Sequence, residues 1–352
     1  MSNRTNQAPG SLLRRWSGAH PLSLGGFVLV VAGMVVLPLV VTNPFYQNLW
    51  TRILIFGLLA MSLDVLLGFT GLLSFMHNSY LGLAAYAAGL FTINVNPESL
   101  WLAMLVGVVF TMIIAWPVGW LQVRTGGLAF ALLTMAFGMM YYTVAWKWHD
   151  VTGGDDGLVA AIEHGLPKVA EEGMVPYLDI NLGPWNLGNT SDPVHVYYLV
   201  LFIVVVAFIL THRMVNSPLG AVLEAIRENE ERASFVGINV RRFKLIGWLV
   251  ACGLAGLAGT LWMFLERNIA PDTMHAFEGA EVLMMVLLGG MGSLWGPFLG
   301  AGIFILLKDC LSSATEHWEI YVGLVVIFLV LFLPKGVAGL SSMLRRKPSE
   351  NK

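Results

Sequence analysis

The chain has 352 residues, of which 57% are hydrophobic and 12% are charged. Soluble globular domains are about 45–50% apolar and about 25% charged. A soluble enzyme of this size is therefore excluded, and the mean hydropathy of +0.72 indicates a protein that uses lipid as its solvent. The net charge of −2 argues against nucleic acid as a partner.

A polar N-terminal tail, residues 1–21, precedes an apolar stretch that lacks a signal-peptide cleavage site and should remain as the first span. About 20 apolar residues cross the hydrocarbon core of a bilayer. The sequence therefore predicts an all-α polytopic membrane protein of about ten transmembrane helices, some of them short or broken. The expected spans are 22–42, 46–67, 75–92, 100–121, 127–146, 195–211, 245–265, 281–289, 296–310 and 319–333.

These spans make one transmembrane domain, residues 22–340, which is followed by a polar C-terminal tail, residues 341–352. An acidic excursion at 149–193 and a basic one at 212–244 interrupt the spans. Most Lys and Arg residues lie on the side of the basic excursion and the two tails, so the positive-inside rule predicts that both termini are cytoplasmic. The excursion at 149–193 is then external.

Motifs of catalysis and metal binding are absent from the sequence. The chain contains no G-x-x-x-x-G-K-[ST], H-E-x-x-H, C-x-x-C or G-x-S-x-G pattern, and its histidines are scattered without ligand spacing. Cys252 and Cys310 lie in separate apolar stretches. We therefore expect no catalytic residue, no metal and no cofactor.

Two glycine-rich stretches, residues 68–82 and 288–302, interrupt the spans. Non-helical backbone at membrane depth is tolerated where it is buried in protein or lines a watery cavity, which favours broken helices beside a transport pathway. The alternative is a glycine-packed helix contact in which Ser hydroxyls bond to neighbouring backbone. The paired breaks are also consistent with an internal two-fold repeat. The candidate pathway residues here are Gly71, Ser74, His77, Asn78, Ser79, Gly289, Gly290 and Gly292.

A third candidate group follows the fifth span at the expected outer mouth. Its glycines can offer backbone N–H groups to a carboxylate, and its acids can attract an ammonium group, as an amino acid substrate requires. A plain exposed turn is the alternative. The residues are Thr152, Gly153, Gly154, Asp155 and Asp156.

Asp64 lies within the second expected span, about one turn from its inner end. An intramembrane carboxylate suggests a functional site. Its position near the boundary favours a capping or packing role over proton coupling, because the cost of a charge falls away from the bilayer centre.

The basic excursion contains an amphipathic helix. Ser217 is its expected N-cap, Pro218 its first residue and Gly237 its end. The apolar face can seat in a groove on a cytoplasmic partner. The alternative, a helix lying on the membrane, is opposed by four acids that the anionic inner leaflet would repel.

With these motifs in order, the chain resembles the LivM-type permease subunits of bacterial branched-chain amino acid ABC importers, from about residue 45 to 340. The resemblance is carried by the stretches 68–74, 152–158, 225–229, 237–239, 254–259, 288–297 and 333–336. Asp64 stands where a neutral amide is usual in that family.

The resemblance implies a pore-forming subunit, not an enzyme, in the bacterial inner membrane. Its partners would be lipid, a second permease of the LivH kind, two cytoplasmic ATP-binding subunits and a periplasmic solute-binding protein. Alternatives are an ABC permease for urea or short amides, an ion-coupled transporter or channel that uses Asp64, and a membrane scaffold without transport. The candidate ATPase-coupling residues are Glu224, Ala225, Arg227, Glu228, Glu231, Ala233 and Gly237.

Overall fold

The structure is a computed structural model that describes residues 24–95, 99–158, 178–182, 185–315, 317–332 and 336–339. The chain divides into two compact units, Met1–Val41 and Thr42–Lys352. In the first unit, helix α2 (Leu24–Val40) is apolar and contains Pro38. The expected tails, 1–21 and 341–352, and residues 159–177 of the external excursion lie outside the described residues.

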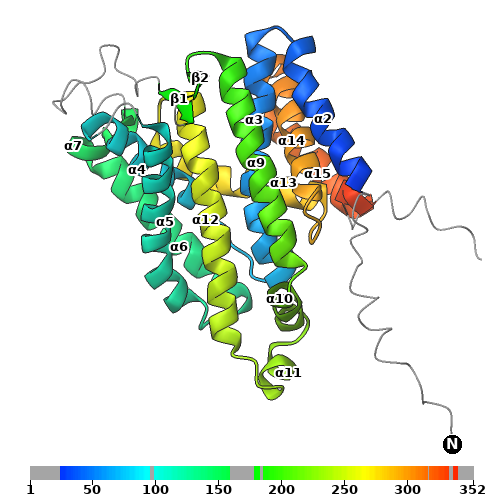
Figure 1. Cartoon of the computed structure of the whole chain (residues 1–352). Helices are drawn as coiled ribbons and strands as arrows, with labels where there is room; N and C mark the ends of the chain where they lie inside the picture. Colours follow the sequence, from blue (N-terminus) through cyan, green and yellow to red (C-terminus); the bar gives the residue numbers. More distant parts are fainter. Residues whose placement is uncertain are drawn as a thin grey trace, which may run out of the picture. The chain divides into compact units, whose positions relative to one another are not determined.

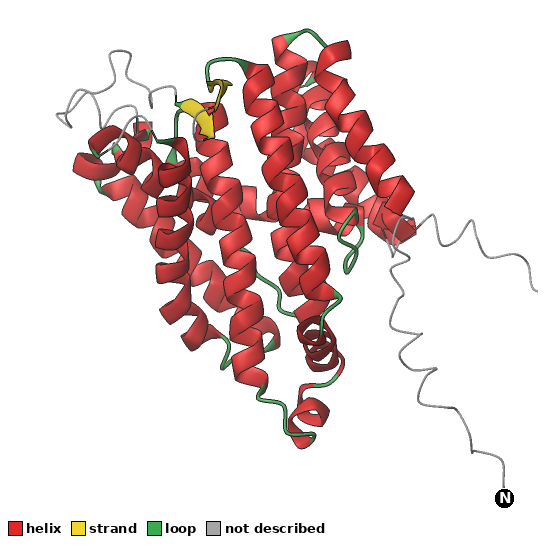
Figure 2. Ribbon diagram, viewed as in Figure 1, coloured by secondary structure: helices red, strands yellow, loops and turns green. Residues whose placement is uncertain are grey.

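Long helices make up most of the second unit, and the strands among the described residues form one small hairpin (Figure 2). The long helices in chain order are α3 (Pro44–Asp64), α4 (Asn78–Asn94), α5 (Leu100–Gln122), α6 (Gly127–Lys147), α9 (Pro193–Val215), α12 (Val240–Glu266), α13 (Ala276–Gly289), α14 (Gly296–Ala314) and α15 (Trp318–Phe332).

Short elements occupy the two ends of this helical unit. At one end lie α7 (His149–Thr152) and the antiparallel hairpin of β1 (Asp179–Leu182) and β2 (Trp185–Asn189). At the opposite end lie α10 (Pro218–Glu228) and α11 (Glu230–Phe235) (Figure 1). The described parts of the two polar excursions therefore lie at opposite ends of the helices (Figure 1).

Each expected span overlaps one described helix, and six helices are long and apolar enough to cross a membrane. The boundaries differ most at α12, which begins at Val240 rather than at the expected residue 245, and equally at α13, which begins at Ala276 rather than at the expected residue 281. Glu278 and Glu281 make its first turns polar, so hydropathy places the start too late. The His275 side chain caps the helix by accepting a hydrogen bond from Phe277 N–H (3.4 Å).

Helices α3 and α12 form the core of the second unit. Helix α12 packs against α3, α4 and α5, while α3 also packs against α9, α13 and α14. In the most apolar stretch of α3, 83% of the residues are buried, against 28% for α5. The outer helices thus present apolar side chains outwards, which suits a protein surrounded by lipid.

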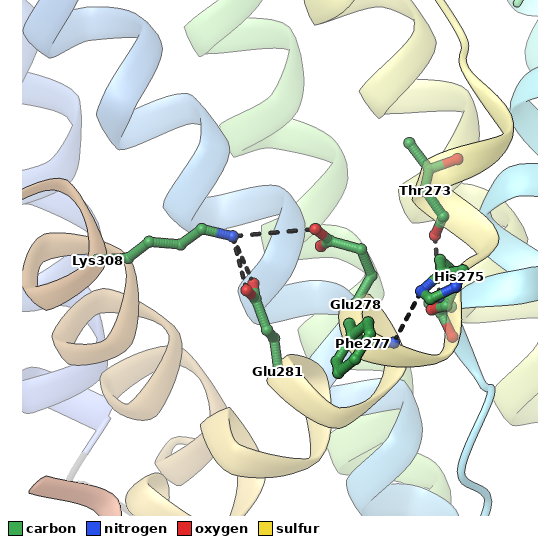
Figure 3. A network of polar contacts seen from close by, with 7 residues as sticks. Thr273, His275, Phe277, Glu278, Glu281 and Lys308 are labelled. Atoms are coloured by element: carbon green, nitrogen blue, oxygen red, sulfur yellow. Dashed lines mark hydrogen bonds and ion pairs between the residues drawn. The ribbon is translucent and has the colours of Figure 1, made fainter. Parts of the chain in front are cut away.

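An ion-pair network joins α13 to α14 (Figure 3). Lys308 of α14 donates to both carboxylate oxygens of Glu281 at 2.7 and 2.8 Å, and it lies 3.9 Å from Glu278. The Lys308 ammonium also lies 4.9 Å from the centroid of the Trp318 ring, which brings in α15. Because the Glu281 side chain is only 15% exposed, its charge depends on this lysine.

We expect the change Lys308→Met to destabilise the protein by about 1–3 kcal/mol, because it leaves the Glu281 carboxylate largely buried without its cation. Thermal unfolding in detergent measures the loss. The matched control is Arg52→Met, which breaks the more exposed Arg52–Glu266 pair (2.7 Å; side chains 46% and 33% exposed) and should cost less than about 1 kcal/mol. Equal losses in the two variants would contradict the role assigned to Lys308.

Candidate functional site

The first glycine-rich stretch is a true helix break. Helix α3 continues as a π-helical turn, Val65–Thr70, in which the Thr70 hydroxyl donates to the Leu66 carbonyl. The turn ends at Gly71, whose φ of 72° lies in the left-handed region that glycine adopts without strain. Non-helical backbone then leads to α4, which starts at Asn78.

The polar side chains that follow Gly71 point into the protein. Ser74, His77, Asn78 and Ser79 are all buried. His77 Nε2 lies 3.0 Å from Ser62 Oγ of α3. Asn78 Nδ2 donates to the carbonyls of Thr273 and His275, both at 2.9 Å, and so ties the start of α4 to the segment before α13.

Several buried oxygens in this cluster are left without a hydrogen bond within the described part of the chain. They are Ser74 Oγ, Ser79 Oγ and Asn78 Oδ1. The alternative in which the two Ser hydroxyls bond to neighbouring backbone is therefore not what the structure contains. Buried polar atoms without hydrogen-bond partners are rare in proteins. One explanation is that these oxygens bind a polar solute or water in another state of the protein.

Aromatic rings close the cluster on the side of α12. The fully buried Trp248 donates its indole N–H to the Ala115 carbonyl of α5 at 3.0 Å. Its ring meets those of Tyr80 and His77 at centroid distances of 5.4 and 6.3 Å. Tyr80 in turn meets Tyr141 of α6 edge to face. The break is therefore lined by polar groups and packed rings from four helices.

The second glycine-rich stretch also breaks the helical path. Helix α13 ends at Gly289, and α14 begins at Gly296. Between them, the φ angles of Gly290 and Gly292 are 105° and 76°. Ser293 closes the turn, because its hydroxyl donates to the Gly290 carbonyl (3.0 Å) and accepts from Gly296 N–H (3.1 Å).

The two breaks meet through Asp64. The Asp64 side chain is fully buried, and its Oδ1 accepts a hydrogen bond of 2.8 Å from Gly292 N–H, 228 residues further along the chain. The sequence favours a capping or packing role for Asp64; its side chain makes no capping hydrogen bond in its own helical segment and instead packs against the other break. Sequence patterns indicate that both breaks exist; the contact between them has no local signal.

The external candidate group forms a packed turn beyond α6. The Thr152 hydroxyl donates to the carbonyls of Ala145 and Trp148, and Asp155 Oδ1 accepts from Trp146 Nε1 at 2.9 Å. Gly153 N–H donates to the His149 carbonyl. The structure therefore uses several of these groups internally, while the carboxylates of Asp155 and Asp156 stay exposed. This group begins at the last residue of α7, at the end of the helices opposite α10 and α11 (Figure 1).

The basic excursion contains two helices rather than the one expected to run to Gly237. Ser217 caps α10 by accepting from Leu219 N–H (3.2 Å), as predicted. Asn229 then leaves the helical conformation, and its Oδ1 accepts from Arg232 N–H (2.8 Å) to start α11. An Asn side chain that satisfies free N–H groups favours a cap over a helix interior, which explains the break.

Some of the candidate coupling residues face solvent and others face the helices. Glu228, Glu231 and Gly237 are exposed, Glu224 and Ala225 are half-buried, and Ala233 is buried. Arg227 turns inwards at its tip, and its Nη1 donates to the Gly68 carbonyl of the first break.

Two exposed apolar residues at the end of α11 were not identified from the sequence. Phe235 and Val236 are 87% and 78% exposed. Nearby, Glu230 pairs at 2.5 Å with Lys244 of α12, whose side chain is 2% exposed, so the start of α11 is anchored. Two adjacent apolar residues before a glycine in a charged segment are the signal that was available.

No three His, Cys, Asp or Glu side chains in the described ranges are grouped so that they hold a metal ion. A hydroxyl does lie beside an imidazole, since Ser62 Oγ is 3.0 Å from His77 Nε2, but both side chains are buried and the hydroxyl donates to the Leu59 carbonyl. The pair therefore contributes to polar packing between helices. That chemistry suits the passage of a solute.

The comparisons with known proteins agree with this arrangement. Residues 45–333 match the family described as branched-chain amino acid transport system, permease component. The permease protein LivM of the high-affinity branched-chain amino acid transport system of Escherichia coli is 25% identical over 296 residues, which cover 82% of this chain and 68% of LivM. The corresponding LivH protein of Salmonella typhimurium is 24% identical over 306 residues, covering 81% of this chain and 91% of LivH.

No solved structure matches the chain. The family match nevertheless extends over most of the sequence and includes both helix breaks and the α10–α11 segment. The chain therefore belongs to the permease components of branched-chain amino acid ABC transport systems and is a multi-pass membrane protein, not an enzyme.

Proposed function

We propose that this chain forms one half of the membrane pathway of an ABC importer for branched-chain amino acids. A second permease of the LivH kind supplies the other half, two cytoplasmic ATP-binding subunits drive the cycle, and a periplasmic solute-binding protein delivers the substrate. The protein lies in the bacterial inner membrane, and the helices that match the ten expected spans cross it with both termini in the cytoplasm. The two breaks are the corresponding points of an internal repeat.

The charge distribution supports this orientation. The α10–α11 end carries a cluster of arginines, Arg227, Arg232, Arg241 and Arg242, and the opposite end carries the exposed Asp155 and Asp156. Basic residues favour the cytoplasmic side of a membrane. The ATP-binding subunits are cytoplasmic, so α10 and α11 face them in this orientation.

The unpaired buried oxygens at the first break carry the assignment of the substrate path. Ser74, Asn78 and Ser79 place hydrogen-bonding groups inside an apolar unit, where a carboxylate or ammonium group in transit needs replacements for its water shell. The sites must bind weakly so that the substrate leaves again. Affinity then resides mainly in the binding protein.

The tip of α11 supports docking on an ATP-binding subunit. Phe235 and Val236 offer an apolar anchor, and the exposed acids Glu228 and Glu231 lie in the same short segment. A central apolar anchor within a polar rim is the usual arrangement of a specific protein interface.

Transport by the reconstituted complex tests the function. Proteoliposomes that contain this chain, the permease and ATP-binding subunits encoded by neighbouring genes, and the binding protein should accumulate leucine, isoleucine or valine only with ATP. A proton gradient without ATP should drive no uptake. Uptake of urea or acetamide in place of these amino acids would overturn the substrate assignment, and gradient-driven uptake without the ATP-binding subunits would overturn the ABC mechanism.

We expect the change Ser79→Ala to lower the rate of uptake about three- to tenfold, the effect of losing one hydrogen bond to the passing solute. It should leave thermal stability unchanged or slightly raised, since the Ser79 hydroxyl has no partner in this state. The control is Ser62→Ala, which removes a hydroxyl that donates to the Leu59 carbonyl (2.6 Å) and should lower stability. Normal uptake by the Ser79 variant would place the pathway elsewhere.

We expect the change Phe235→Asp to remove the ATP-binding subunits from the purified complex, because a charge replaces the apolar anchor. Co-purification from detergent and uptake in vesicles measure the effect. The matched control is Ser234→Asp, which adds the same charge to the neighbouring exposed position and should retain most of the complex. Equal loss in both variants would show that charge alone, and not the apolar side chain, is responsible.

A further inference from the structure

We infer that Arg227, Asp64 and the two helix breaks form one polar junction that transmits motion of α10 to both breaks together. In this inference, which rests on the proposed function, Arg227 and Asp64 are positioning residues and do not touch the substrate.

The breaks contact each other so closely that they cannot move independently. A Cβ atom on Gly68 would overlap Asp64 Oδ1 and would lie 2.5 Å from Gly292 N. Glycine at position 68 therefore allows Asp64 to reach the Gly292 N–H group across the contact. Shifting either break alone would break this buried hydrogen bond and leave its donor unpaired, which is costly.

Arg227 lies along the same contact from the cytoplasmic side. Its Nη1 donates to the Gly68 carbonyl, 159 residues away in the chain. A Cβ on Gly71 would lie 3.1 Å from Arg227 Cγ, and a Cβ on Gly292 would lie 3.6 Å from Nη1. The arginine thus follows the first break with its stem and reaches the second break with its charged tip.

Arg227 acts on the first break through its hydrogen bond to Gly68 and on Asp64 through its positive charge. Asp64 Oδ2 is buried and has no hydrogen-bond partner among the described residues. The Arg227 guanidinium lies beside Gly68 and Gly292, the two residues that contact Asp64 Oδ1, so it brings a positive charge close to this carboxylate. A buried carboxylate needs such compensation, so the two residues are coupled energetically although they share no direct hydrogen bond.

Helix α10 is attached firmly enough to move this arginine as part of a rigid element. Leu223 and Ile226 are buried on its inner face, and Leu223 packs beside Gly247 of α12. Its other end continues into α11, which carries the exposed Phe235. A displacement of α11 by its partner therefore reaches Gly68 and Gly292 through α10, which packs against the first break and carries Arg227 to both glycines.

The sharpest test separates ATP hydrolysis from transport in the complete complex in proteoliposomes. The change Arg227→Gln should retain substrate-stimulated ATP hydrolysis but lower the amount of substrate carried per ATP about tenfold. A residue that only stabilises the fold would lower both activities in proportion to the folded complex. The matched control is Arg213→Gln, the same change at an exposed position in the last turn of α9, which should keep the normal ratio.

The change Asp64→Asn keeps an oxygen for the Gly292 N–H group but removes the charge. Added to Arg227→Gln, it should restore part of the ratio of transport to hydrolysis, because no uncompensated carboxylate remains. Proportional loss of hydrolysis and uptake in the Arg227 variant, or an equal fall in ratio in the Arg213 control, would overturn the inference.

A second measurement keeps this inference separate from the proposed function. Thermal unfolding of the permease in detergent, with the two single variants and the double variant, gives the coupling between Asp64 and Arg227 without any transport. The loss of stability in the double variant should be smaller than the sum of the single losses. Additive losses would overturn the junction even in a complex that transports normally, whereas failure of the unaltered complex to use ATP for uptake would contradict only the proposed function.

Discussion

The backbone of the two helix breaks must find hydrogen-bond partners inside the protein, because lipid offers none. This constraint organises the structure around Asp64. The Asp64 carboxylate accepts a hydrogen bond from the N–H group of Gly292, which lies in the turn between α13 and α14, and Gly68 allows the approach. The break in one part of the chain is thus completed by a side chain from another. Both breaks are held at one place, beside the buried polar cluster and within reach of Arg227.

The same constraint explains how a permease can be both stable and ready to move. Most of the second unit consists of apolar helices that pack against α3 and α12. This close apolar packing resists rearrangement. The breaks are different, since they are kept by a few directed bonds and surround oxygens that have no partner in this state. Discrete polar contacts can be exchanged for others, while close-packed apolar surfaces resist gradual deformation. Motion is therefore expected at the breaks, with the long helices moving as rigid bodies.

Features set by residues close together in the sequence could be predicted, whereas contacts between residues far apart in the sequence could not. Hydropathy located every expected span on a helix, and it placed the start of α13 too late only because Glu278 and Glu281 occupy that end. Local capping rules identified Ser217 but missed Asn229, which has the same chemistry within a pattern that otherwise suits a continuous helix. The candidate residues at the breaks were found from their glycines. The direction of Arg227 was not, since exposed and inward-turned arginines have the same helical spacing.

The sequence by itself determined that this is a helical membrane protein, where its helices lie and break, and which family its motifs resemble. These properties follow from local composition and from periodicities of a few residues. Only the tertiary structure decided that the hydroxyls of Ser74 and Ser79 are buried without a hydrogen-bond partner among the described residues. It also decided that the two breaks touch, through the hydrogen bond from Gly292 N–H to Asp64, and that Arg227 reaches the breaks from α10. The reason is that these contacts join residues 159 and 228 positions apart. Helix packing sets such contacts, and no local pattern encodes them.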